Sequence, residues 1–262
     1  NVLSIRYDGE PSRSGDEKYE YYSFVSNTSA WIVDRMQRSA LYASDNATKE
    51  KETLFYYDNL GYGSSPIRGE LTTRQEWINP GANATTNYTY DSYGNVIVKT
   101  DPNGKNTTYT FDVVTRTFAE KVTNAKGFSW NYTYDIGTGN LLDEIETNGF
   151  TTRYRYDPVG RLRKVLRPFD NGTYPSINYN YSLDGTAPEQ INVSYREMNQ
   201  TADTLDEYYF YDGFGNVIQV KREAESSQQS IEDIFYDANW RVASKSNPYF
   251  SSFAPGYTTP SS

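Results

Sequence analysis

An aromatic residue followed directly by aspartate recurs along most of the chain, and this spacing is the strongest constraint on its fold. The pairs are Tyr57-Asp58, Tyr90-Asp91, Phe111-Asp112, Tyr134-Asp135, Tyr156-Asp157, Tyr211-Asp212 and Tyr236-Asp237. Between Asp91 and Asp157, successive aspartates are 21, 23 and 22 residues apart. The longer step from Asp157 to Asp212 leaves room for a degenerate unit around Tyr181–Gly185. A period of this length predicts a repeat protein built from one small unit.

Segment 130–166 shows one complete unit. Large and polar side chains alternate in 130–135 and again in 153–156, as in a strand with two different faces. Asp157-Pro158-Val159-Gly160 matches a type I turn, because Asp accepts backbone hydrogen bonds, Pro presets φ and Gly tolerates positive φ. Asn148-Gly149 predicts a two-residue hairpin turn. The unit is therefore expected to be a strand, an aspartate corner, a second strand and an Asn-Gly turn.

The aspartate corners are expected to be structural turns and not catalytic acids, because they recur regularly before a turn. Two copies, at Thr115-Arg116 and Asn239-Trp240-Arg241, lack the glycine. The predicted corner residues are Asp58, Asp91, Gly94, Asp112, Asp135, Gly139, Asp157, Gly160, Asp212, Gly215 and Asp237.

Three copies of the motif, Tyr90–Val96, Tyr156–Leu162 and Tyr211–Val217, carry a family resemblance. Tyr-Asp-x-x-Gly-Asn/Arg followed by a hydrophobic residue resembles the YD-repeat (RHS-repeat) family, as in toxin-complex B/C-type shells, contact-dependent Rhs proteins and teneurins. With weaker copies the resemblance covers about 56–250. It implies long β-sheet ribbons that spiral into hollow shells.

The expected fold is all-β, an antiparallel β-hairpin repeat ribbon (a YD-repeat meander) that forms part of a larger shell or an assembly. Seven to eight hairpins would give about 14–16 strands at the usual spacing, and a free sheet of that width leaves two open edges. We therefore expect the remainder of a longer chain, or copies of this one, to cover those edges. Because it starts at Asn1, the chain is expected to be a processed product or an excerpt. The expected divisions are an N-terminal irregular/β segment with a possible degenerate repeat (1–50), the YD-repeat array (51–250) and a Ser/Thr/Pro/Gly-rich tail resembling a linker (251–262).

Several segments are ambiguous. Segment 31–52 could contain a short helix or a long strand leading into a loop. Segments 171–190 and 201–207 resemble inserted loops, and 223–232 a polar tip. Lys221-Arg222 and 161–164 are short basic patches, which are most simply charge balance or edge protection.

The composition excludes several chemistries. The chain has no Cys and no His, which excludes thiolate and His-bearing zinc sites and His-dependent triads. A net charge of −9 argues against a nucleic-acid partner, and no apolar run approaches the ~20 residues that a membrane span needs. Asp143, Glu144 and Glu146 could bind a cation or flank a sugar, but a solvated face is the simpler interpretation. We predict no catalytic residues, no metal site and no cofactor.

The glycosylation triplet Asn-x-Ser/Thr is frequent. Five of its asparagines fall on strand faces opposite aromatic residues, where a sugar is tolerated if the aromatic face packs inward. An amphipathic strand also places Asn and Thr on its wet face, so an ordinary polar surface is the alternative. Glycosylation would make the protein extracellular or cell-surface. The triplets begin at Asn27, Asn46, Asn83, Asn87, Asn106, Asn131, Asn171, Asn180, Asn192 and Asn199.

Two functions from different classes remain. The first is a non-enzymatic structural segment of a secreted or cell-surface protein, acting as scaffold, fibre or encapsulating wall. The alternative is an adhesin whose aromatic residues bind carbohydrate or protein, although Trp77, Trp130 and Trp240 are more simply expected to pack within the wall. A casing segment of a toxin-delivery protein is the third possibility.

Overall fold

A computed structural model describes residues 2–10, 12–198 and 201–260. The fold is all-β, as predicted, and its one helical element in the described residues is the three-residue 3₁₀ turn η1 (Thr28–Ala30). No helix in those residues is long and apolar enough to cross a membrane. The chain divides into two compact units, Asn1–Asn131 and Tyr132–Ser262.

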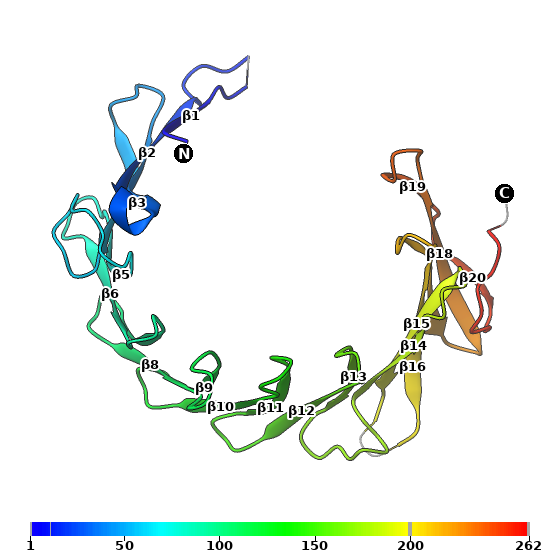
Figure 1. The fold of residues 1–262 in the computed structure, drawn as a ribbon. Helices are drawn as coiled ribbons and strands as arrows, with labels where there is room; N and C mark the ends of the chain where they lie inside the picture. The colour runs from blue at the N-terminus through cyan, green and yellow to red at the C-terminus, as the bar shows by residue number, and fades with distance from the viewer. Residues whose placement is uncertain (1, 11, 199–200, 261–262) are drawn as a thin grey trace. The chain divides into compact units, whose positions relative to one another are not determined.

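In the first unit each strand pairs antiparallel with the next strand along the chain, giving successive hairpins (Figure 1). The strands are β1 (Ser4–Tyr7), β2 (Lys18–Asn27), β3 (Ile32–Tyr42), β4 (Lys49–Tyr57), β5 (Leu71–Glu76), β6 (Ala84–Tyr90), β7 (Val96–Thr100), β8 (Asn106–Phe111), β9 (Ala119–Thr123) and β10 (Ser129–Tyr134), whose first three residues belong to this unit. Segment 31–52 therefore forms a long strand and not a helix.

The second unit repeats the pattern up to β18, which pairs with both β19 and β20. Its strands are β11 (Leu141–Ile145), β12 (Thr151–Tyr156), β13 (Leu162–Leu166), β14 (Ile177–Ser182), β15 (Glu189–Arg196), β16 (Thr204–Tyr211), β17 (Val217–Ala224), β18 (Gln228–Tyr236), β19 (Val242–Lys245) and β20 (Tyr249–Ser252).

The described residues form 20 strands, more than the 14–16 expected. The difference arises partly because the expected inserted loops contain strands: β14 lies in 171–190, and β16 begins in 201–207. The expected polar tip at 223–232 is confined to the exposed turn 225–227, because the other residues belong to the hairpin of β17 and β18. In β16–β18 the alternating polar residues include side chains that are buried, such as Gln219, Lys221 and Gln229.

The aromatic residue of six corners sits at a break in strand register. The register shifts at Tyr56/Tyr57, Thr89/Tyr90, Thr110/Phe111, Arg155/Tyr156, Phe210/Tyr211 and Phe235/Tyr236. Such a β-bulge adds one residue to one strand and increases the local twist. These six units of the repeat therefore carry a bulge next to the aspartate corner.

The alternation of the strands separates an aromatic face from a polar face. In β10, Trp130, Tyr132 and Tyr134 are half-buried, whereas Asn131 and Thr133 are exposed. Because these strands form a single layer, the aromatic rings shield one another only partly. Full burial among the described residues is concentrated in β16–β18, where Phe210, Lys221 and Ile231 lie.

Candidate functional site

The aspartate corners share one hydrogen-bond pattern. Oδ1 of Asp91 accepts the backbone N–H groups of Tyr93 (2.8 Å) and Asn95 (2.9 Å), and Oδ2 accepts the side-chain amide of Asn95 (3.1 Å). Asp212 repeats these contacts with Phe214 and Asn216, at 2.9 Å each. The asparagine after the glycine is therefore part of the corner.

Arginine fills the same position in two other corners. Oδ2 of Asp157 accepts Nε of Arg161 at 2.7 Å, and Oδ2 of Asp237 accepts Nε of Arg241 at 2.9 Å. Arg and Asn both present an N–H group to the second carboxylate oxygen, which explains why the motif reads Asn or Arg there.

A left-handed residue closes each corner. Gly94, Gly160 and Gly215 have φ of 90°, 86° and 84°. Where the glycine is missing, Trp240 (φ 60°) and Arg116 (φ 56°) adopt the left-handed conformation instead. The backbone geometry of the corner therefore persists in copies that have lost the glycine.

The remaining corners vary in loop length. Asp58 accepts four consecutive backbone N–H groups, from 67–70, at 2.6–3.1 Å. Asp112 accepts the N–H groups of Val114, Thr115, Thr117 and Phe118. Asp135 accepts that of Thr138 at 2.8 Å, with Gly139 closing its turn. All the predicted corner residues of the motif therefore lie at turns.

Burial would raise the pKa of Asp91, Asp157 and Asp212, but the hydrogen bonds that each carboxylate accepts outweigh it, so their pKa values are lowered. At Asp237 the backbone and side chain of Arg241 are the main causes of a lowered pKa. A general acid needs a raised pKa near neutral pH. These carboxylates are stabilised as anions that hold the turns.

The turn at Asn148-Gly149 differs from the expected two-residue type. The N–H of Glu146 donates to the carbonyl of Phe150 (2.8 Å), and the N–H of Gly149 donates to the carbonyl of Glu146 (2.9 Å). Three residues lie between the paired positions, and Gly149 has φ of 82°. This is a type I turn with a left-handed bulge residue, the same geometry as the aspartate corner.

A tyrosine hydroxyl links each of several hairpins to the previous corner, an arrangement that we call the tyrosine latch. Its acceptor is the backbone carbonyl of the hydrophobic residue that follows a corner. The latches are Tyr90 to Leu71 (2.8 Å), Tyr156 to Leu141 (2.9 Å), Tyr181 to Leu162 (2.7 Å) and Tyr236 to Val217 (3.0 Å). The latch is not among the features predicted from the sequence, although the preference for Tyr over Phe in the motif is a signal for it.

The other candidate residues do not converge. Asp143 pairs with Arg155 (3.5 Å), and Glu144 accepts the hydroxyl of Tyr154 (3.3 Å). The described residues contain no group of three carboxylates placed to hold a metal ion. Trp77 and Trp130 are half-buried, but Trp240 is exposed against Phe214, with ring centroids 4.3 Å apart, so its expected burial in the wall is wrong.

The asparagines of the triplets lie mostly on the polar face. Asn87 and Asn106 are exposed, and each accepts a hydroxyl from a threonine of the neighbouring strand, Thr73 and Thr100, at 2.8 Å. Their side chains therefore also link strands. Asn46, Asn83, Asn131, Asn171 and Asn180 are exposed, Asn27 and Asn192 are half-buried, and Asn199 lies outside the described residues.

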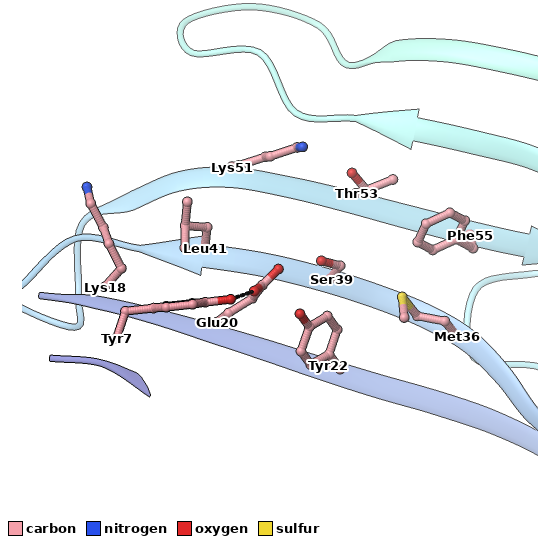
Figure 2. A pocket seen from close by; sticks show the side chains of 10 residues that line it. All are labelled: Tyr7, Lys18, Glu20, Tyr22, Met36, Ser39, Leu41, Lys51, Thr53 and Phe55. Carbon is pink, nitrogen blue, oxygen red and sulfur yellow. Dashed lines mark hydrogen bonds between the residues drawn. The ribbon is translucent and has the colours of Figure 1, made fainter. Parts of the chain in front are cut away.

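A hollow of about 550 Å³ lies on β2–β4 beside β1 (Figure 2). Lys18, Glu20 and Tyr22 line it from β2, and the hydroxyl of Tyr7 donates to Glu20 at 3.0 Å. Lys18 forms an ion pair with Glu50. The hollow is a sheet surface with mixed charge and presents no set of convergent reactive groups.

Comparison with known proteins supports the resemblance at the level of the fold. No protein-family model matches the chain. Over 118 residues the chain is 30% identical to "Double-stranded DNA deaminase toxin A" of Burkholderia cenocepacia (strain H111), covering 44% of this chain and 8% of that protein.

Two crystal structures share its architecture. That of TcdB2-TccC3 has a TM-score of 0.68 at 10% identity, covering 89% of this chain and 18% of the other. That of TcdB2-TccC3-Cdc42 has a TM-score of 0.68 at 9% identity, covering 89% and 20%. The chain thus spans about a fifth of the solved chains and less than a tenth of the curated relative. Over most of its length, it has the fold of a segment of the TcdB2-TccC3 structures.

Proposed function

We propose that this chain is a non-enzymatic wall segment of a larger YD-repeat casing, of the kind found in toxin-type proteins. The observation that carries the proposal is the tyrosine latch, which joins four hairpins to the preceding corner. The latch joins neighbouring hairpins through the tyrosine of the motif. The carboxylates of Asp91, Asp157, Asp212 and Asp237 hold the turns and have lowered pKa values, which does not suit a general acid.

The shared fold with TcdB2-TccC3 and the short match to a deaminase toxin favour a toxin-related casing over a generic fibre. Any toxic activity would reside elsewhere in a longer protein. Secretion, or display at the cell surface, is part of this proposal. N-glycosylation of the triplets stays a prediction, checked by intact mass before and after deglycosylation against 30.0 kDa for the bare chain.

Open strand edges support a place within a longer wall. Among the described residues, β1 pairs with β2 alone, and its four residues are all exposed. An edge of unpaired N–H and C=O groups is a template for another strand. The continuation of a wall would satisfy it.

Edge pairing can be tested on the chain itself by light scattering after size-exclusion chromatography. The proposal expects concentration-dependent association that Ile5→Lys in β1 weakens. Tyr195→Lys is the matched control, since Tyr195 is exposed to a similar extent but pairs with Ile177 on one side and Leu205 on the other.

A stable monomer whose mass is the same with and without Ile5→Lys would contradict the edge argument. If such a monomer were retained on a glycan array, the adhesin alternative would be favoured. The residue to examine then would be Trp31, which is 90% exposed after η1.

A further inference from the structure

The tail after β20 is not a free linker. It leaves β20 and runs back across β17 and β18 within the second unit (Figure 1). Beneath it lie Gln219, Lys221 and Ile231, each 0% exposed. These side chains are the most buried of the described residues, although two of the three are polar.

Lys221 binds the tail through its ammonium group. Nζ donates to the carbonyls of Ala254 (3.2 Å) and Gly256 (2.5 Å) and to the hydroxyl of Thr258 (2.6 Å). These three acceptors all belong to the tail. The expected role of Lys221 in charge balance or edge protection is therefore wrong, since a fully buried lysine is rare unless its charge is satisfied.

Two glutamines form hydrogen bonds with the backbone of the tail. Nε2 of Gln219 donates to the carbonyl of Thr258 (2.7 Å), and its Oε1 accepts the N–H of the same residue (3.1 Å). Oε1 of Gln229 accepts the N–H of Ala254 at 3.2 Å. Gln219 thus offers the tail a donor and an acceptor, as a neighbouring strand would.

Aromatic rings fix the register of the tail. Phe253 packs on Tyr208 with centroids 6.1 Å apart, and Tyr257 packs edge-on against Phe210 at 5.7 Å. The two anchors are four residues apart, and Pro255 and Gly256 lie between them. The aromatic contacts and the hydrogen bonds therefore involve the same stretch of peptide, residues 253–258.

Tyr208, Phe210, Gln219, Lys221 and Gln229 contact the tail, and we call the surface that they form the groove. The groove lies on the polar face of the repeat. Asn192 pairs with Tyr208, Tyr208 with Lys221, and Lys221 with Ile231, so the row that carries asparagine on β14 and β15 carries groove residues from β16 onward. A repeat needs only solvent on this face. On β16–β18 the same face carries aromatic and amide side chains that contact the tail.

We propose that the polar face of β16–β18 is a peptide-binding groove, occupied here by the chain's own residues 253–258. Its ligand is a peptide that bends at a Pro-Gly step, with aromatic residues at the first and fifth positions. The tail of a second copy has this chemistry and would fit the groove of the first whenever its own tail has left.

The test uses the full chain and a fluorescent synthetic peptide with the sequence of residues 252–259. In the native chain the tethered tail competes at an effective concentration of about millimolar. The double substitution Phe253→Ala and Tyr257→Ala weakens the tail but leaves the groove intact. We expect this variant to bind the peptide at least about tenfold more tightly than the native chain.

The control adds Lys221→Met to that variant, which should weaken peptide binding by about tenfold because the charge-assisted hydrogen bonds to carbonyls are lost. Equal binding by the native chain and the tail variant would overturn the proposal. So would binding that Lys221→Met leaves unchanged.

Amide hydrogen exchange on the native chain gives a second readout that depends on no variant. The N–H groups of Phe253, Ala254 and Thr258 each have an acceptor in the second unit and should exchange more slowly than in the free peptide. Exchange at the free-peptide rate would show that the groove does not hold the tail, and the proposal would fall.

Discussion

The hydroxyl of Tyr181 donates a hydrogen bond of 2.7 Å to the backbone carbonyl of Leu162, which lies opposite Tyr156 at its register shift. The tyrosine of one hairpin therefore satisfies a backbone group at the bulge of the previous one. Tyr236 makes the same contact with Val217, opposite Tyr211. A phenylalanine would fill the same space but leave the carbonyl without this donor.

Tyr181→Phe tests the latch. The substitution keeps the ring beneath Arg161 and removes only the hydroxyl. We expect the free energy of unfolding to fall by about 0.5–1.5 kcal/mol, the usual contribution of one hydrogen bond. Urea unfolding followed by circular dichroism measures it. Tyr179→Phe, two residues away on the same face, is the control and should change stability less; equal losses would remove the latch as an explanation.

Arg116→Gly tests the left-handed corner that has lost its glycine. Arg116 has φ of 56°, and its carbonyl accepts the side chain of Asn95 at 2.7 Å, so the conformation is held in place. A non-glycine residue there costs about 1–2 kcal/mol. Thermal unfolding should show Arg116→Gly to be more stable than Arg116→Ala by roughly that amount, since both variants lack the guanidinium. If the alanine variant matched or exceeded the glycine variant, the position would not be strained.

The buried ion pair of Asp170 and Arg196 should be costly to break. Their side chains are 0% and 8% exposed, and Asp170 also accepts the N–H of Ser176 at 2.7 Å. Arg196→Met leaves a buried carboxylate without its cation, and we expect a loss of about 3–5 kcal/mol in the free energy of unfolding. The exposed Arg163→Met should cost less than about 1 kcal/mol in the same assay. Similar losses for both would mean that the pair is effectively solvated.

Acid should destabilise the repeat through its corners. The folded pKa of Asp91, Asp157, Asp212 and Asp237 lies below the ordinary 3.8, so the unfolded chain binds more protons than the folded chain on acidification. Their contribution is fully present above that value and is lost as pH falls through the folded pKa. Melting temperature should therefore drop steeply on acidification through this range.

Asp91→Asn provides the check on that acid dependence. An asparagine can still accept the backbone N–H groups with its one oxygen but has no titrating carboxyl group. The variant should lose less stability between neutral and acidic pH than the parent chain. If Asp91→Asn lost as much stability between neutral and acidic pH as the parent chain, the corner would not explain acid unfolding.

The amino-acid sequence by itself determined the corners and the alternation of faces. Asp, the left-handed residue and the Asn or Arg after it act within five residues, so local turn chemistry suffices to predict them. Because these signals are local, they also explain the wrong turn type predicted at Asn148-Gly149. Asn148-Gly149 has the turn residues of two turn types, and only the pairing of β11 with β12 selects between them.

Only the tertiary structure decided which face of β16–β18 is buried and what Lys221 does. Its acceptors in the tail are 33 to 37 residues away in sequence, and the latch of Tyr181 spans 19. The sequence of a polar alternating strand is the same whether water or another segment covers one face. The alternation indicates that the strand has two different faces, but it does not indicate what lies against either of them. Burial of Lys221 follows from where the tail folds back, which no local pattern encodes.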